Sequence, residues 1–350
     1  MPLQKIIDSG LGVLEDRVRW FDVGALCLEG QGWEDTVGRF DRLPGRAEGE
    51  VREAVWNLSR HSAGMCVRFV TDARAIRARW TVTQDRLAMV HMPATGVSGL
   101  DLYVKWEGQW RWVGVGRPEE MPTNEGVLVD GVPEGIHEYR LYLPLYNGVS
   151  SVEVGVGEDA MIGVPEVGDE KPIVFYGTSI THGACASRPG MGHSAILGRR
   201  LGRPIINLGF SGNGTMDLEL ATLFGELDPC VFVIDCLPNM AAEQIAERAG
   251  SFVKILREAR PDTPILLVED RTYPKAFFVE AQRVRNETSR AALRTVYESL
   301  VSEGVPGLHY LPGEGLLKDD SEGTVDGSHP TDLGFVQQAN AFEPVLQSLL

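Results

Sequence analysis

Cysteine is scarce in this sequence, and the few cysteines present lack the spacing of a metal or redox motif. There are five of them, without a C-x-x-C pair: Cys27, Cys66, Cys185, Cys230 and Cys236. An odd and scattered set argues against a disulfide framework and against a zinc cluster. We therefore expect free, buried thiols in a reducing compartment.

Basic residues and long apolar runs are also in short supply. The 33 lysines and arginines face 49 aspartates and glutamates, which gives a formal net charge of −16 at pH 7. Such a surface repels nucleic-acid phosphates and anionic lipids, so we expect neither a nucleic-acid nor a membrane partner. No apolar run approaches the length of a membrane span, and residues 1–8 lack the apolar core of a signal peptide. The expected protein is soluble and cytoplasmic, although a signal peptide removed before residue 1 and a homo-oligomer both remain open.

The chain of 350 residues is long enough for two domains, and its pattern changes near residue 160. Residues 1–160 show short segments of alternating polar and apolar residues, separated by turn signals such as Glu107-Gly108. Strands are expected at residues 67–71, 75–82, 100–106, 109–115, 137–143 and 151–156. This spacing predicts an all-β sandwich of jelly-roll-like type. Trp110 and Trp112 share one face of their strand, which we expect in the core, with an exposed sugar-stacking platform as the alternative.

Residues 170–350 show a different pattern, after a stretch at 157–170 whose glycine, proline and acidic residues indicate a linker. Strands are expected at residues 173–176, 204–208, 230–235, 264–269 and 308–310. Helices are expected at residues 193–201, 216–226, 241–259, 278–302 and 332–350. This alternation predicts an α/β domain whose parallel sheet is covered by helices on both faces. The segment 278–302 is too long to cover one sheet without bending, so we expect part of it to be a loop.

A serine follows the first strand of this second region. Residues 173–176 form a short apolar run between Pro172 and Gly177, and Ser179 comes two residues after that glycine. Ligands gather at the carboxyl ends of parallel strands in open α/β sheets. Ser179 is therefore a candidate nucleophile, with a helix N-cap as the simpler alternative.

Three further polar blocks lie after a predicted strand or before a predicted helix. They contain Gly212 within residues 209–214, Asn239 after a proline, and the sequence Asp326-Gly327-Ser328-His329. If the alternation holds, all of them line the same edge of the sheet as the serine.

The residue types in these blocks match the needs of acyl transfer. A serine hydroxyl needs a base to take its proton, and His329 is the candidate, with Asp326 to hold its ring in the right tautomer. The oxyanion needs hydrogen-bond donors, which the backbone N–H groups of Ser179 and Gly212 and the amide of Asn239 would supply. The order of the blocks along the chain carries this prediction, because each block alone is a weak signal.

Each block also has a structural alternative. Asp326 and His329 could form an N-cap box before the last helix or belong to a metal site, and Asn239 could be a plain N-cap. Residues 209–214 could cradle a phosphate, although the P-loop lysine is missing. His182 is an alternative base and Cys185 an alternative nucleophile. The first lacks a nearby carboxylate, and no positive group is evident to lower the pKa of the second.

These blocks resemble those of the SGNH (GDSL-type) hydrolases. Ser179, Gly212, Asn239 and His329 match the four residues for which the family is named, and Asp326 matches its Asp-x-x-His block. The resemblance covers roughly residues 170–350. It implies a flavodoxin-like three-layer α/β/α fold and an esterase, lipase or carbohydrate deacetylase activity that needs no metal.

The sequence differs from the family pattern at two places, and it contains a second motif that resembles related proteins. Thr178 stands where the family usually has Asp, and the block around Asn239 has a proline before it and a methionine after it. Residues 99–103, Gly-Leu-Asp-Leu-Tyr, resemble the Gly-x-Asp-Leu-Tyr motif of the β-sandwich that precedes one bacterial branch of these hydrolases. Relatives with such a domain often deacetylate polysaccharides, which the resemblance implies as an expectation here.

We therefore predict a β-sandwich domain at residues 1–160 and an SGNH hydrolase domain at residues 170–350. The expected activity is that of a serine esterase that removes a short acyl group, acetyl in the first instance, from a small-molecule or carbohydrate ester, with no cofactor and no metal. One alternative is a non-catalytic carbohydrate-binding protein on a decayed hydrolase fold. Another is a flavodoxin-like domain that binds phosphate or a nucleotide through residues 209–214.

Overall fold

The structure, a computed structural model, describes residues 3–350, which group into two compact units. The first unit contains the chain up to residue 42 together with residues 60–169 and 187–190, and the second contains residues 43–59, 170–186 and 191–350. The main change between them, at residues 169 and 170, lies at the end of the predicted linker. The sequence did not predict that residues 43–59 group with the second unit or that residues 187–190 group with the first. The predicted independent domains at 1–160 and 170–350 stay a prediction, and residues 1 and 2 lie outside the described part.

The first unit consists of two antiparallel β-sheets. One sheet has the order β1 (Leu3–Ile6), β12 (Ile162–Pro165), β5 (Cys66–Thr71), β10 (His137–Tyr142), β7 (Leu100–Trp106) and β8 (Gln109–Gly116), with β4 (Cys27–Glu29) also paired to β5. The other has the order β2 (Val13–Glu15), β3 (Val18–Asp22), β11 (Val149–Gly157), β6 (Ala75–Val82) and β9 (Thr123–Asp130). The unit also contains the short helix α2 (Ala94–Val97). All six predicted strands are present, and the strands that were not predicted are mostly short.

Alternation along the strands builds the core of this unit. Every second side chain of β6 is buried, and Trp80 on that strand is fully covered, with its indole N–H donating to the Ser98 carbonyl at 2.9 Å. The core position expected for the Trp110–Trp112 stripe is wrong, because Trp112 is 49% exposed. Its ring has the Arg188 guanidinium 5.1 Å from the centroid. A cation on the ring face explains how this tryptophan is accommodated at the surface.

The second unit is built on a five-stranded parallel sheet. Its order is β14 (Ile205–Gly209), β13 (Ile173–Gly177), β15 (Val231–Asp235), β16 (Ile265–Val268) and β17 (Leu308–Leu311). Numbered along the chain, this is the order 2-1-3-4-5 of flavodoxin-like folds, in which ligands bind where the strand order reverses. All five predicted strands are confirmed, with ends shifted by one residue at most.

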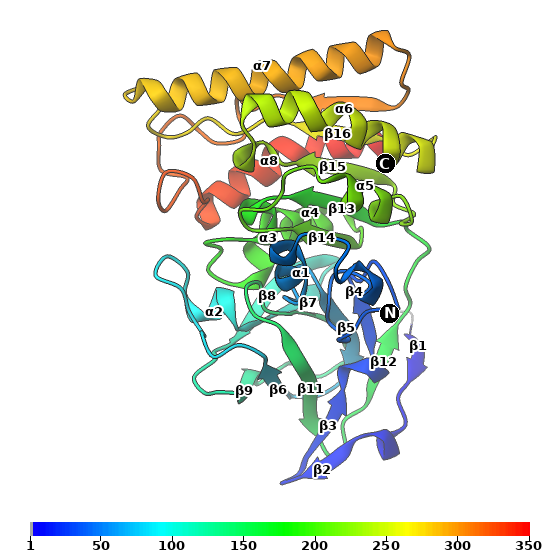
Figure 1. The fold of residues 1–350 in the computed structure, drawn as a ribbon. Coiled ribbons are helices and arrows are strands. Elements are labelled where there is room, and N and C mark those ends of the chain that lie inside the picture. The colour runs from blue at the N-terminus through cyan, green and yellow to red at the C-terminus, as the bar shows by residue number, and fades with distance from the viewer. Residues whose placement is uncertain (1–2) are drawn as a thin grey trace. The chain divides into compact units, whose positions relative to one another are not determined.

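Helices cover both faces of this sheet, as two neighbouring residues of β13 show. Side chains of successive strand residues point to opposite faces. Phe175 contacts the rings of His193 on α4 (His193–Leu201) and Phe342 on α8 (Asp332–Leu349). Tyr176 contacts Phe224 on α5 (Leu218–Phe224) and Phe252 on α6 (Ala242–Ala259). The unit therefore has three layers, as predicted, with α4 and α8 on one face and α5 and α6 on the other (Figure 1).

Two helices of this unit differ from the prediction. Helix α7 (Glu280–Ser302) is continuous, so the expected loop within 278–302 is wrong. Its length is accommodated because it packs along α6 and β17 (Figure 1). Helix α1 (Glu53–Ser59), which comes from the region expected to be all-β, buries Val55 and Trp56 and belongs to this unit. Within residues 3–350, no helix combines the length and apolarity needed to cross a membrane.

Candidate active site

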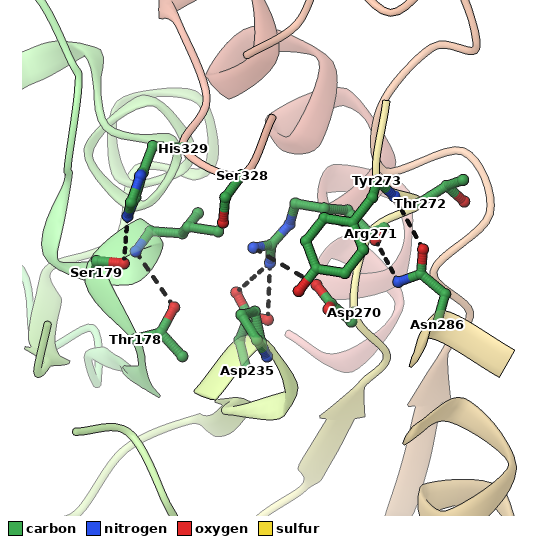
Figure 2. A network of polar contacts seen from close by, with 12 residues as sticks. Thr178, Ser179, Asp235, Asp270, Arg271, Thr272, Tyr273, Asn286, Ser328 and His329 are labelled. Atoms are coloured by element: carbon green, nitrogen blue, oxygen red, sulfur yellow. Dashed lines mark hydrogen bonds and ion pairs between the residues drawn. The ribbon is translucent and has the colours of Figure 1, made fainter. Parts of the chain in front are cut away.

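The candidate nucleophile is the first residue of a short helix that follows strand β13. Strand β13 ends at Gly177, and Ser179 is the first residue of α3 (Ser179–His182). The N-cap of this helix is Thr178, whose hydroxyl accepts from the Ile180 N–H at 3.3 Å (Figure 2). The capping role proposed as the simpler alternative for Ser179 therefore belongs to its neighbour. Ser179 itself is 7% exposed.

The serine, the histidine and the aspartate form one chain of hydrogen bonds. Ser179 Oγ lies 2.9 Å from His329 Nε2, and His329 Nδ1 lies 2.7 Å from Asp326 Oδ2 (Figure 2 shows the first contact). The other carboxylate oxygen of Asp326 accepts from the backbone N–H groups of Ser328 at 3.0 Å and His329 at 2.9 Å. The N-cap of α8 is Thr331, so Asp326 does not cap that helix.

The environment of Asp326 determines the tautomer of the histidine. Partial burial raises the pKa of this carboxyl, but the hydrogen bonds from the His329 ring and from the two backbone N–H groups outweigh it and lower the pKa to about 2. The carboxylate is therefore ionised at neutral pH and can only accept, so the proton of the neutral imidazole lies on Nδ1. The lone pair of Nε2 then faces Ser179 Oγ, as a general base requires.

The alternative base and the alternative nucleophile lie in less suitable surroundings. His182 is fully buried in the last turn of α3, and the hydroxyl of Ser179 is bonded to His329. Burial, with a smaller contribution from Asp326, raises the pKa of the Cys185 thiol to about 12. A thiol that stays protonated at neutral pH is a poor nucleophile.

The glycine-rich block lies against the nucleophile turn. Gly212 has φ +70°, a left-handed conformation that favours glycine. At Gly214 a Cβ would lie 2.2 Å from the Gly177 carbonyl oxygen, so only glycine permits this approach. Asn239 Oδ1 accepts from the Gly214 N–H at 3.2 Å, which joins the second and third predicted blocks. The N-cap of α6 is Ala241, so Asn239 is not the plain N-cap considered above.

A buried ion pair next to the site was not predicted. Asp235, the last residue of β15, accepts from Arg271 Nη2 at 3.1 and 3.2 Å, and both side chains are at most 1% exposed (Figure 2). Burial raises the pKa of Asp235 to about 6, against the opposing effect of Arg271. Burial also raises the pKa of the adjacent Asp270. A carboxylate that ends an otherwise apolar strand was the one signal in the sequence that could have indicated this pair.

A second unpredicted residue connects strand β14 to the nucleophile helix. The buried side chain of Asn207 donates to the Thr181 carbonyl at 2.6 Å and accepts from the Gly209 N–H at 2.9 Å. A Cβ at Gly209 would lie 2.2 Å from the backbone nitrogen of His182, so the strand end and the helix are in direct contact. The amide thus fixes both segments around the serine.

Comparison with known proteins agrees with this arrangement. The model of the GDSL-like lipase/acylhydrolase family matches residues 170–347, just over half of the chain. The chain belongs to this family. A second model, for the N-terminal GxDLY region of SGNH-hydrolase-type esterases, matches residues 18–162 of this GDSL-type hydrolase. Both families named from the sequence motifs are therefore confirmed.

Solved structures show the same fold over nearly the whole GDSL-type chain. A Bacteroides ovatus protein described as a GDSL-like lipase is 36% identical, over 95% of this chain and 98% of that one, with a TM-score of 0.90. The salicylyl-acyltransferase SsfX3 of a tetracycline biosynthetic pathway is 20% identical over 96% and 98%, with a TM-score of 0.76. A family two carbohydrate esterase from Clostridium thermocellum is 16% identical over 82% and 92%, with a TM-score of 0.62. A comparison with curated proteins finds no match.

These findings establish the general activity. The chain is an esterase/acylhydrolase of the GDSL type, with the SGNH hydrolase fold in its second unit and an antiparallel β-rich region before it. The last two structures are too distant in sequence to show more than the fold. The expectation that catalysis needs neither a metal nor a cofactor stays a prediction.

Proposed function

We propose that the protein is a serine esterase that acts through Ser179, His329 and Asp326. The observation that carries the proposal is the chain of hydrogen bonds from Ser179 Oγ to His329 Nε2 at 2.9 Å and from His329 Nδ1 to Asp326 Oδ2 at 2.7 Å. An imidazole held in this tautomer can take the hydroxyl proton as the oxygen attacks, and the ionised aspartate stabilises the imidazolium that results.

The reaction proceeds through an acyl-enzyme. Ser179 Oγ forms a bond to the ester carbonyl carbon while its proton moves to His329 Nε2. The tetrahedral intermediate then collapses, the bond to the alcohol oxygen breaks, and His329 gives its proton to the leaving alcohol. A water molecule, deprotonated by His329, attacks the acyl-enzyme, and the acid leaves as Ser179 regains its proton.

The oxyanion in this mechanism is stabilised by the backbone N–H groups of Ser179 and Gly212 and by the side-chain amide of Asn239. Support for the third donor comes from its contact with the glycine-rich block. Because Asn239 Oδ1 accepts from the Gly214 N–H, Nδ2 is the end of the amide that can donate to a ligand. Three preorganised donors would supply several kcal/mol, since removing one such donor typically costs about 10²–10³ in rate.

For the substrate we propose a short-chain acyl ester, acetyl in the first instance, on a neutral alcohol of small-molecule or carbohydrate type. The net charge of −16 disfavours a strongly anionic substrate. Structures with the same fold include the Clostridium thermocellum carbohydrate esterase and an acetyl xylan esterase from Butyrivibrio proteoclasticus, which is 12% identical with a TM-score of 0.57. At this identity they support a substrate class to test first.

The test of the mechanism is the Ser179→Ala variant. It should lower kcat for p-nitrophenyl acetate by at least about 10³-fold while the unfolding midpoint stays within a few degrees of the wild-type value. The matched control is Ser302→Ala on the exposed side of α7, which should leave turnover unchanged. Turnover that survives in the Ser179→Ala variant would mean that another group is the nucleophile.

A fluorophosphonate probe separates the esterase from a non-catalytic carbohydrate-binding protein on the same fold. The probe reacts covalently with an activated serine and leaves a mere binding cleft unlabelled. We expect stoichiometric labelling of the wild-type protein at Ser179 and none of the Ser179→Ala variant. An unlabelled wild-type protein would favour the binding function.

A further inference from the structure

A cleft of about 680 Å³ lies in the second unit, and one of the segments that line it passes close to the turn between Asp326 and His329, because a Cβ at Gly327 would lie 3.7 Å from Cε of Lys275. One wall, within residues 272–277, follows strand β16, and the other, within residues 314–321, follows strand β17. Both walls leave the carboxyl ends of parallel strands, the edge of the sheet where ligands bind. Ser321 Oγ donates to the Pro274 carbonyl at 2.9 Å and joins the walls. The second wall continues along the chain directly to Asp326.

The lining of this cleft combines an exposed aromatic ring with carboxylates. Phe277 is 85% exposed and lines the cleft, whereas its neighbour Phe278 is 83% exposed and does not. The carboxylates in the lining belong to Glu314, Asp319 and Asp320, against the single ammonium of Lys318. Single exposed apolar side chains are common on protein surfaces, but this ring lies in the wall of a cleft beside hydrogen-bond acceptors, which is the combination that suits a sugar ring. The excess of acidic groups repels an anionic ligand.

We infer that this cleft binds a pyranose ring of a neutral carbohydrate, as the subsite for the alcohol part of the substrate. The apolar C–H face of the sugar stacks on Phe277, and its hydroxyls donate to the carboxylates on the opposite wall. This inference rests on the proposed esterase function and adds the class of alcohol that the enzyme accepts.

Phe277→Ala tests the inference against Phe278→Ala as the matched control. The substrates are chemically acetylated xylohexaose and cellohexaose, with p-nitrophenyl acetate for comparison. We expect Phe277→Ala to raise KM for the acetylated hexasaccharides about 5–10-fold and to change kcat/KM for p-nitrophenyl acetate less than twofold, while Phe277→Trp restores the wild-type KM. Phe278→Ala should behave as the wild type.

The possible failures can be told apart. Turnover of p-nitrophenyl acetate without turnover of either hexasaccharide, or an equal KM for Phe277→Ala and Phe278→Ala, would overturn the subsite and leave the esterase standing. A wild-type protein inactive on all three substrates would overturn the proposed function. In that case the subsite is still tested by calorimetry, in which unmodified cellohexaose and xylohexaose are titrated into Ser179→Ala and into the double variant Ser179→Ala/Phe277→Ala. The proposed subsite requires weaker binding to the double variant.

A second inference rests on different contacts, those of an arginine from the N-terminal part of the chain. Arg52 directly precedes helix α1 and belongs to the unit that contains Ser179. Its Nη1 donates to Asn213 Oδ1 at 2.6 Å, and its Nη2 to the Asn213 carbonyl and to Thr215 Oγ1, each at 3.0 Å. Its Nε and Nη2 both donate to Asp217 Oδ2, at 2.9 and 2.8 Å.

All five hydrogen bonds go to the loop that begins at Gly212. The same loop is also held by Arg248 on α6, which donates to Asp217 Oδ1 at 3.0 Å and to the Thr215 carbonyl at 3.2 Å. A guanidinium is suited to this role because its donors lie in one rigid plane and its charge does not titrate. Only the Arg52 fork reaches residue 213, immediately after the proposed oxyanion donor.

We propose that Arg52 is a positioning residue for the oxyanion hole. It holds residues 213–217 so that the Gly212 N–H keeps its direction toward the developing oxyanion. A displaced donor stabilises the transition state less, while ground-state binding of a small ester changes little. This proposal also rests on the esterase function.

Arg52→Ala should lower kcat for p-nitrophenyl acetate about 10–100-fold with KM within twofold of the wild type. Added guanidinium at low millimolar concentration should restore at least a fifth of the lost activity, and Arg52→Lys should retain an intermediate kcat. The matched control is Arg46→Ala, which removes a guanidinium paired to Glu226 from the same segment, and it should leave kcat unchanged.

Equal kcat values for Arg52→Ala and Arg46→Ala would overturn the positioning role. The positioning role would also be overturned if added guanidinium does not restore the kcat of Arg52→Ala and if the lost activity is proportional to the unfolded fraction measured by circular dichroism. If Arg52→Ala does not fold, the kcat of Arg52→Lys tests the positioning role instead. A wild-type kcat for Arg52→Lys would show that the planar guanidinium is not needed. A wild-type chain without esterase activity would instead contradict the proposed function.

Discussion

Replacing Asp326 by asparagine tests the central geometry of the site. The amide oxygen of asparagine can still accept from the backbone N–H groups of Ser328 and His329, so the turn should keep its shape. Its NH₂ group, however, can take the place of Oδ2 and donate to His329 Nδ1. The imidazole would then carry its proton on Nε2 and could not accept the proton of Ser179.

The size of the effect follows from the exposure of this residue. In a fully buried triad the same change costs about 10⁴ in kcat, because the histidine is held in the wrong tautomer. The side chain of Asp326 is 40% exposed, so water can compete for the amide and allow the correct tautomer part of the time. We therefore expect a loss of about 10²–10³-fold, which corresponds to about 2.7–4 kcal/mol of transition-state stabilisation.

The assay is kcat for p-nitrophenyl acetate, measured from pH 5 to pH 9. Since the pKa of Asp326 is about 2, the carboxylate of the wild type stays ionised over this whole range, so titration of Asp326 should not appear in the wild-type pH profile. Asp326→Ala also loses the turn hydrogen bonds and should show a lower unfolding midpoint than Asp326→Asn. An Asp326→Asn enzyme within threefold of wild-type kcat would refute the role of the carboxylate in holding the tautomer.

Three further predictions concern the surroundings of the nucleophile. Gly214→Ala places a Cβ 2.2 Å from the Gly177 carbonyl oxygen, so kcat should fall at least about tenfold and the unfolding free energy by about 1–3 kcal/mol, whereas Gly126→Ala, which has open space, should change neither. Cys185→Ser should keep wild-type kcat, and iodoacetamide at pH 8 should leave Cys185 unmodified by mass spectrometry, since its pKa is about 12. Arg285→Ala removes donors to the carbonyls on both sides of Asn239 and should lower kcat about tenfold with KM unchanged.

Much of the second unit was predictable because its signals are local. The strand before Ser179 is an uninterrupted apolar run, which is what burial on both faces of a parallel sheet requires. The residues of the candidate site could be named for a related reason. Few residue types can serve as nucleophile, base or oxyanion donor, and the fold places them at strand ends, so type and position together limit the choice.

The residues that hold the site in place could not be named in this way. Asp235 and Arg271 are neighbours only because β15 and β16 are adjacent in the sheet, and each on its own is an ordinary charged residue, one at the end of β15 and the other three residues after β16. Trp112 was expected in the core because alternation shows which residues share a face, but not whether that face is covered. Contacts between distant segments determine both which charged residues meet and which strand faces are covered. Such contacts leave no periodic pattern in the sequence.

Arg52 shows that a site of this kind can depend on a segment outside the predicted hydrolase domain. Residues 43–59 precede most of the β-strands and contain one short α-helix and one 3-10 turn, so the sequence places them with the sandwich. Their side chains nevertheless pack in the hydrolase unit, and one of them makes five hydrogen bonds to the loop next to Gly212. The region matched by the hydrolase family model begins only at residue 170 and so excludes this arginine. If the oxyanion hole depends on Arg52, the catalytic unit of this enzyme is larger than its family domain, and its N-terminal segment contributes to the rate of the reaction.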